Sequence, residues 1–240
     1  FRRVLFRSAG NDVSLTKKAE RRDGEFESPF GTLIVATFAM FARKYMHDYG
    51  ATEEDLAEVS VAARAWANLH PKAQMGKVRI TKEDVLNSPM VASPLRRLNC
   101  SLVSDGGTAM VLTSLERARE HGNRAITLLA SEVVYGNGHG IVTDDLGQIE
   151  SLYSIREGSS IAVKRALDRT GLRPQDFDVR FCYDPFAFMP WFYMEALGLC
   201  KEGEGAAFAR GGRLGPGGDA PLNTHGGIDR KSTRLNSSHT

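Results

Sequence analysis

Two helices are predicted by the spacing of apolar residues in the first third of the chain. Between residues 29 and 49, apolar side chains recur every three or four positions, which places them on one helical face: Ile34, Phe38, Phe41 and Tyr45. Gly50 is a suitable stop for this helix. Thr52, followed three residues later by Asp55, is typical of a capped helix start, and Pro71 is expected to end that second helix.

The pattern changes after a loop-rich stretch that contains Pro89 and Pro94. Apolar runs that suit buried strands now alternate with segments of helical period. Strands are expected at 109–113, 125–134 and 178–183, and helices at 115–121, 151–170 and 186–199. Such alternation favours α/β layers. The glycine-rich run 203–218 is expected to be a surface excursion that returns the chain near Asn223.

Composition is that of an ordinary globular protein, with 42% hydrophobic and 25% charged residues in a chain of 240. The longest apolar-rich stretch, 32–42, is too short to span a bilayer, and no secretory signal is evident. Cys100, Cys182 and Cys200 match no metal motif, so no metal is expected. Reduced thiols in a cytoplasmic protein are the simplest interpretation.

The two ends of the chain need separate treatment. Residues 1–8 and 229–239 read as translations of opposite strands of one DNA oligonucleotide, which resembles a sequencing-library adapter. We therefore expect residues 1–8 and 229–240 to be artefactual and leave them out of the fold interpretation. They carry six basic residues and one acid, so without them the formal net charge changes from +2 to −3. No nucleic-acid partner is expected for such a chain.

Three short runs combine turn-forming residues with polar side chains. Asp105 precedes two glycines, which permits a sharp turn before a buried strand. The run from Cys182, Cys-Tyr-Asp-Pro-Phe, lies where an expected strand meets a helix, a place from which side chains can reach a pocket. The third run is Asn-Thr-His-Gly-Gly, from Asn223. Taken singly, Tyr183 suits an amphipathic wall residue and His225 a structural histidine.

In this order, the three runs resemble those of the thiolase superfamily. Residues 46–67, His-Asp-Tyr-Gly and a capped helix, are also similar to the thiolase loop domain that covers coenzyme A. The resemblance extends over nearly all of 29–227 and implies an α/β fold, the five-layer αβαβα sandwich with its loop domain. It divides the chain into a loop domain with a preceding linker (9–100), the last part of the N-terminal half (101–116) and a partial C-terminal domain (117–228).

Tyr183 identifies the branch that the chain resembles. Thiolases have at this position the asparagine of Asn-Glu-Ala-Phe, which fixes a catalytic water. The sterol-carrier and lipid-transfer branch has a histidine or a tyrosine there, which implies a catalytic role for Tyr183. Asp184, Pro185 and Phe186 depart from the thiolase motif, and this weakens the case for ordinary thiolysis.

The resemblance also implies residues that bind substrate or coenzyme A. Ser101 matches a serine that contacts the pantetheine arm. The Asn-x-x-Gly-Gly motif contributes Asn223, His225, Gly226 and Gly227.

The family's other catalytic groups have no counterpart in the chain. These are the nucleophilic cysteine and the histidine of Gly-His-Pro. Cys182 and Cys200 are expected to be small core residues instead. We therefore expect the chain itself to be inactive, with apolar faces such as that of Phe38 and Phe41 left uncovered.

The resemblance implies that the longer protein is a thiolase-like acyltransferase that acts on acyl-CoA thioesters by thiolysis or Claisen-type acyl transfer. Two alternatives stay open: a retro-aldolase of steroid side-chain-type acyl-CoA, and a non-catalytic subunit that binds acyl-CoA. In each case coenzyme A belongs to the substrate, and no covalently bound cofactor is expected. The expected partners are a second copy of the protein and a small accessory domain protein.

Overall fold

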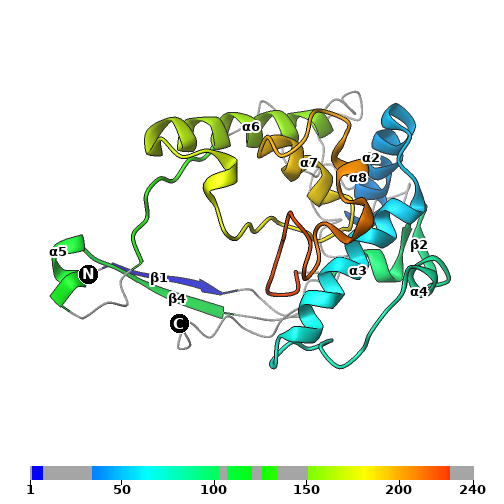
Figure 1. Ribbon diagram of the computed structural model, residues 1–240, viewed down its shortest axis with the longest axis horizontal. Helices are drawn as coiled ribbons and strands as arrows, with labels where there is room; N and C mark the ends of the chain where they lie inside the picture. Colours follow the sequence, from blue (N-terminus) through cyan, green and yellow to red (C-terminus); the bar gives the residue numbers. More distant parts are fainter. Residues whose placement is uncertain (1, 8–33, 103–106, 121–125, 135–150, 228–240) are drawn as a thin grey trace, which may run out of the picture.

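The computed structural model describes residues 2–7, 34–102, 107–120, 126–134 and 151–227 (Figure 1). The strands are β1 (Arg2–Arg7), β2 (Met90–Ala92), β3 (Leu95–Arg96) and β4 (Gly107–Leu112). The helices are α2 (Ile34–Tyr49), α3 (Glu53–Leu69), α4 (Lys82–Leu86), α5 (Leu115–Glu120), α6 (Ser151–Thr170), α7 (Met189–Ala196) and α8 (Gly205–Phe208). Short 3-10 turns lie at η3 (Arg97–Asn99), η4 (Pro174–Asp176) and η5 (Arg210–Gly212).

The helices predicted from apolar spacing and capping are confirmed. The start of α3 is fixed by Asp55, whose carboxylate accepts hydrogen bonds from the backbone N–H and the hydroxyl of Thr52, at 2.9 and 3.3 Å. The same carboxylate pairs with the Arg210 guanidinium at 2.6 and 2.9 Å, which ties α3 to the distant turn η5. The predicted bounds of 151–170 agree with those of α6.

An aromatic core joins α2 to α7. The Phe38 ring lies 4.7 Å from that of Phe186, and the Tyr45 ring lies 5.0 Å from that of Trp191. Burial of such rings contributes strongly to stability because each removes a large apolar area from water. The core includes residues on both sides of the predicted domain boundaries: Phe38, Leu56, Leu95, Phe188, Trp191, Leu214 and Leu222.

A buried network of polar side chains links α7 to α2 and α6. Glu195 accepts a hydrogen bond from the Tyr45 hydroxyl at 2.5 Å and from two glycine backbone N–H groups, those of Gly203 and Gly205. The Arg156 guanidinium of α6 donates to Glu195 at 3.4 Å. Burial, followed by this carboxylate, raises the pKa of Tyr45, so the hydroxyl stays a donor.

Two strand predictions are wrong for the described residues. Segments 126–134 and 178–183 belong to no strand, and the sheets of the described chain are the two-stranded pairs β1–β4 and β2–β3. A strand needs a neighbour for its backbone hydrogen bonds, and these segments have no partner strand in the described part of the chain. Arg2–Arg7, which the sequence analysis set aside, pairs antiparallel with β4, with Arg2 opposite Leu112.

Two further bounds differ from expectation. The helix predicted from residue 186 begins at Met189, because Phe186 forms a bridge with Cys100 and Pro190 suits a helix's first turn. The run 203–218 is not a surface excursion. It contains α8 and η5, and Trp66 donates its indole N–H to the Leu214 carbonyl at 2.8 Å.

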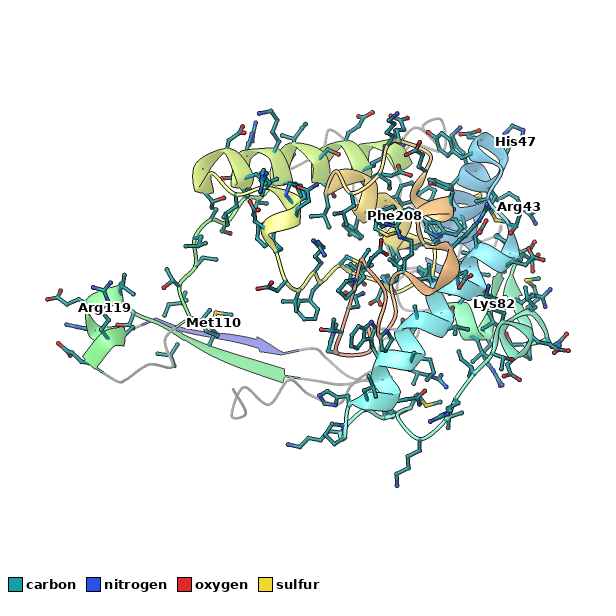
Figure 2. All side chains as sticks on the ribbon, viewed as in Figure 1. Arg43, His47, Lys82, Met110, Arg119 and Phe208 are labelled. Atoms are coloured by element: carbon teal, nitrogen blue, oxygen red, sulfur yellow. The ribbon has the colours of Figure 1, made fainter. Side chains whose placement is uncertain are left out.

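The described chain has an elongated outline in Figure 1, with β4 and α5 extending away from the helices. Met110 and Arg119 lie on that extension, whereas Phe208 lies among the helices (Figure 2). Within the described residues, none of the helices combines the length and hydrophobicity that a bilayer crossing requires.

Candidate functional site

Asn223 joins the segment that carries Tyr183 to the glycine turn that follows it. Its side-chain oxygen accepts from the backbone N–H of Cys182 at 2.8 Å, and its amide nitrogen donates to the Cys182 carbonyl at 3.1 Å. Its own backbone N–H donates to the carbonyl of Arg180 at 2.9 Å. The residue is buried and takes a left-handed φ of 51°, which asparagine tolerates better than most residues. One side chain thus supplies hydrogen bonds that a neighbouring strand would supply.

Ser101 lies along a later part of the same segment. Its backbone N–H donates to the Pro185 carbonyl at 2.8 Å, and the N–H of Ala187 donates to the carbonyl of Asn99 at 2.9 Å. The structure therefore brings together, around residues 180–187, both groups of residues that the sequence singled out. The Ser101 run lies along one part and the Asn223 turn along another.

Tyr183 is 53% exposed, so its phenol is accessible to solvent. A second phenol, that of Tyr193 on α7, is partly buried. Its pKa is raised by burial first and then by its neighbours Cys182 and Tyr183. A protonated phenol of this kind can donate a hydrogen bond to a developing oxyanion.

His225 is fixed in the turn that Asn223 anchors. The Phe181 ring meets the imidazole edge-on, with 4.9 Å between ring centroids and an interplanar angle of 80°. Burial lowers the pKa of His225 and His70 lowers it further, partly opposed by the charge of Asp184 and by the backbone of Asn223. Its Nδ1 atom is buried without a hydrogen-bond partner in the described part of the chain. These conditions favour a neutral imidazole with a fixed orientation.

The two glycines after His225 allow the turn to pack against α3. Gly226 has a φ of +100°, and a Cβ atom there would lie 2.8 Å from the Cα of Ala67. Gly227 has a φ of +70°. No residue with a side chain fits at Gly226 without displacing the helix or the turn.

Burial disfavours the thiolate form of two cysteines, of which Cys182 belongs to this site. Burial raises the pKa of Cys182 well above its usual range, and the charge of Asp184 adds to the effect. Burial and then Glu195 raise the pKa of Cys200 to about 12. Since the thiolate is the nucleophile, these surroundings disfavour either cysteine in that role.

Sequence reasoning missed two neighbours of Tyr183. Tyr193 belongs to an apolar helix face and has no motif of its own. Asp184 was noticed only as a departure from a motif, although a carboxylate in an apolar run is itself a signal. Among the described residues, no group of three or more histidine, cysteine or acidic side chains could hold a metal ion.

Comparison with known proteins identifies similar sequences. Residues 138–237 match the family model described as "Thiolase C-terminal domain-like". A "Steroid side-chain-cleaving aldolase" of Thermomonospora curvata is 38% identical over 205 residues, covering 83% of this chain and 50% of the relative. An "Acetyl-CoA acetyltransferase" of Methanothermobacter thermautotrophicus is 34% identical over 217 residues, covering 90% and 55%.

The backbone has a solved counterpart in an "Ltp2-ChsH2(DUF35) aldolase". The TM-score is 0.73 at 29% identity, and the match covers 96% of this chain and 60% of that one. The chain spans about half the length of the curated relatives it matches. The predicted fold class is confirmed as the part of a thiolase-type fold that the chain spans. The order of the three motifs, the backbone and the relatives agree, and the chain belongs to the thiolase superfamily.

Proposed function

We propose that the longer protein is a carbon–carbon lyase of retro-aldol type that acts on acyl-CoA thioesters. One observation carries the proposal. The accessible phenol of Tyr183 stands where thiolases have the asparagine of Asn-Glu-Ala-Phe, and Tyr193 is its neighbour. The aldolases among its relatives and structural neighbours support the same reading.

The proposed reaction needs proton transfer and charge stabilisation. A base removes the proton of a β-hydroxyl, the bond between the α and β carbons breaks, and a carbonyl product and a thioester enolate form. The enolate then takes up a proton at its α carbon. Tyr183 would exchange one of these protons, and a neighbouring phenol such as Tyr193 would donate a hydrogen bond to the enolate oxygen.

The thioester would lie between the two runs that flank Tyr183. Ser101 would contact the pantetheine arm, since a hydroxyl can donate to and accept from an amide. The turn formed by Asn223, His225, Gly226 and Gly227 would border the acyl group. In this scheme, coenzyme A is part of the substrate.

The decisive experiment replaces Tyr183 with phenylalanine in the full-length protein. If the phenol transfers a proton, turnover falls by about two to four orders of magnitude while substrate affinity changes little. Tyr49→Phe is the matched control, because Tyr49 lies on α2 and bonds Glu202 at 2.9 Å, outside the proposed site. Equal activities of Tyr183→Phe and wild type would remove Tyr183 from the mechanism.

A thiolase-like acyltransferase is the second candidate, favoured by the acetyltransferase relative. Its acyl and proton steps would depend on a cysteine and a histidine elsewhere in the longer protein, so Tyr183→Phe would cost only a few-fold. Product analysis separates the two: a lyase releases a carbonyl compound, and an acyltransferase joins or exchanges acyl groups. Binding of acyl-CoA without either reaction would indicate a non-catalytic subunit.

For partners, we propose a homodimer of the longer protein and an accessory domain protein. The second is supported by the structural neighbour, whose printed name pairs Ltp2 with a DUF35 protein. Light scattering of the full-length protein, alone and after co-expression with such a domain, tests both parts of the proposal.

A further inference from the structure

The segment that carries Tyr183 is held by hydrogen bonds before and after that residue. Before it, Asn223 bonds the backbone of Cys182, and after it the backbone N–H of Ser101 donates to the Pro185 carbonyl at 2.8 Å. The segment belongs to no strand of the described chain, so these contacts take the place of sheet hydrogen bonds. The placement of the Tyr183 phenol therefore depends on them.

The amide of Asn223 is directed at Cys182. Its oxygen accepts from the Cys182 N–H at 2.8 Å, and its nitrogen donates to the Cys182 carbonyl at 3.1 Å. The same nitrogen lies 3.5 Å from the Cys182 thiol. Only one orientation of the amide satisfies the backbone donor and the backbone acceptor together. Because only 3% of Asn223 is exposed, its amide serves the neighbouring backbone, while the turn around it can border an acyl group.

Asn223 also determines which side chains of the segment face outward. Its backbone N–H donates to the Arg180 carbonyl at 2.9 Å, so its bonds reach two residues that are two positions apart and partly buried, Arg180 and Cys182. The alternate residues, Phe181 and Tyr183, are 58% and 53% exposed. Side chains alternate in direction along an extended backbone, so a shift of one residue would turn the Tyr183 phenol inward.

The turn that contains Asn223 is itself fixed to the rest of the protein. The backbone N–H of Leu222 donates to the Leu214 carbonyl at 3.2 Å, and the N–H of Gly226 donates to the Asn223 carbonyl at 2.8 Å. A Cβ atom at Gly226 would lie 2.8 Å from the Cα of Ala67, so the turn abuts α3. Asn223 therefore connects the Tyr183 segment to an anchored part of the fold.

We infer that Asn223 is a positioning residue for Tyr183: its paired hydrogen bonds to the backbone of Cys182 set the register of the segment and the direction in which the phenol projects. This inference rests on the proposed function for the use of that phenol. The direction of the phenol can be measured without any activity.

The kinetic test is a double-mutant cycle in the full-length protein. Asn223→Gly removes both side-chain hydrogen bonds and keeps a residue that tolerates the left-handed φ. It should lower kcat about 10- to 100-fold with little change in KM, because the phenol is misplaced. In the Tyr183→Phe background it should cost less than about threefold, since no phenol remains to be misplaced. An equal loss in both backgrounds would indicate a purely structural role and overturn the inference.

Asn223→Asp is the second variant. It keeps the size of the side chain and the bond from the Cys182 N–H, but it sets an oxygen against the Cys182 carbonyl, so kcat should again fall. Asn68→Asp is the matched control, because the Asn68 amide also donates to a backbone carbonyl, that of Gly76 at 2.8 Å, in the loop after α3. It should leave kcat within about twofold. If neither Asn223 variant folds, Asn223 is a folding determinant and the inference is overturned.

A spectroscopic measurement on the chain tests the placement of the phenol directly. With fluorotyrosine in place of tyrosine, the fluorine NMR signal of Tyr183 is assigned by its loss in Tyr183→Phe. This signal should move or split in Asn223→Gly and stay in place in Asn68→Asp, and an unchanged signal in a folded Asn223→Gly overturns the inference. If Tyr183→Phe keeps full activity, the proposed function fails while the NMR result stands, so the two failures can be told apart.

Discussion

The helical module and the extended segments of this protein have similarly apolar sequences but opposite surroundings. The helical module consists of α2, α3, α7, α8 and residues 209–227, and the extended segments are 126–134 and 178–183. Trp191 in the module is fully buried, whereas Ile126 is 87% and Phe181 58% exposed in the extended segments. A helix satisfies its own backbone and needs only an apolar neighbour, while a strand also needs partner strands.

The comparison corrects one expectation about uncovered surfaces. We expected the α2 face of Phe38 and Phe41 to lack a cover, and this is wrong. Phe38 and Phe41 are buried, and the Phe38 ring lies 4.7 Å from Phe186 and 6.2 Å from Phe188. The extended segments, in contrast, keep apolar residues exposed, such as Leu128 and Val179.

The largest expected effect is the loss of an aromatic anchor of the helical module. Trp191→Ala should lower the free energy of unfolding by about 3–5 kcal/mol, because it removes a large apolar contact and leaves a cavity. Ile126→Ala, in an extended segment, should change it by less than about 0.5 kcal/mol. Urea unfolding followed by circular dichroism measures both. Equal effects of the two substitutions would contradict the division into two regions.

Self-association should depend on the extended segments. Contiguous exposed apolar residues promote association, and a charge within them opposes it. Leu128→Lys should therefore weaken self-association roughly tenfold or more, as measured by sedimentation velocity across a concentration series.

Gln175→Lys is the control for that substitution, because it adds the same charge at an exposed polar position. If both variants associate as the wild type does, another surface carries the contact. If the wild-type chain is monomeric at every concentration, the premise that it self-associates is wrong.

Acid should weaken the link between α3 and η5. Burial alone would raise the pKa of Asp55, but its hydrogen bonds from Arg210 and Thr52 outweigh this and lower the pKa. A group whose pKa is lower in the folded chain stabilises it above the unfolded value near 4 and loses that contribution as pH falls. The stability difference between wild type and Asp55→Asn should thus shrink between pH 6 and pH 3. Chemical denaturation at a series of pH values measures it, and a constant difference would exclude this origin.

The smallest expected effect concerns Ser101, where the run 99–101 meets residues 185–187. Ser101→Ala in the full-length protein should weaken binding of the thioester by about 0.5–1.5 kcal/mol, one hydrogen bond. Isothermal titration calorimetry with an acyl-CoA measures it. Cys100→Ala is a suitable neighbour control, and unchanged binding in Ser101→Ala would remove the residue from the proposed thioester site.

The sequence by itself determined the helices and the superfamily. The Thr52–Asp55 cap, the period of α2 and the bounds of α6 are set by residues within one or two turns of one another, so they can be read locally. The motif order that indicated thiolases is likewise a property of the chain alone.

Only the tertiary structure decided which apolar runs are covered and which polar groups meet. The packing of Gly205 and Leu214 depends on Trp191 and Trp66, and the setting of His225 depends on Asn223, Cys182 and Asp184. The Tyr45–Glu195 hydrogen bond joins positions 150 residues apart. The partner of a strand and the neighbour of a buried carboxylate can come from segments far apart in the sequence. Backbone pairing and charge compensation act through space, so they produce no periodic pattern of residues from which they could be predicted.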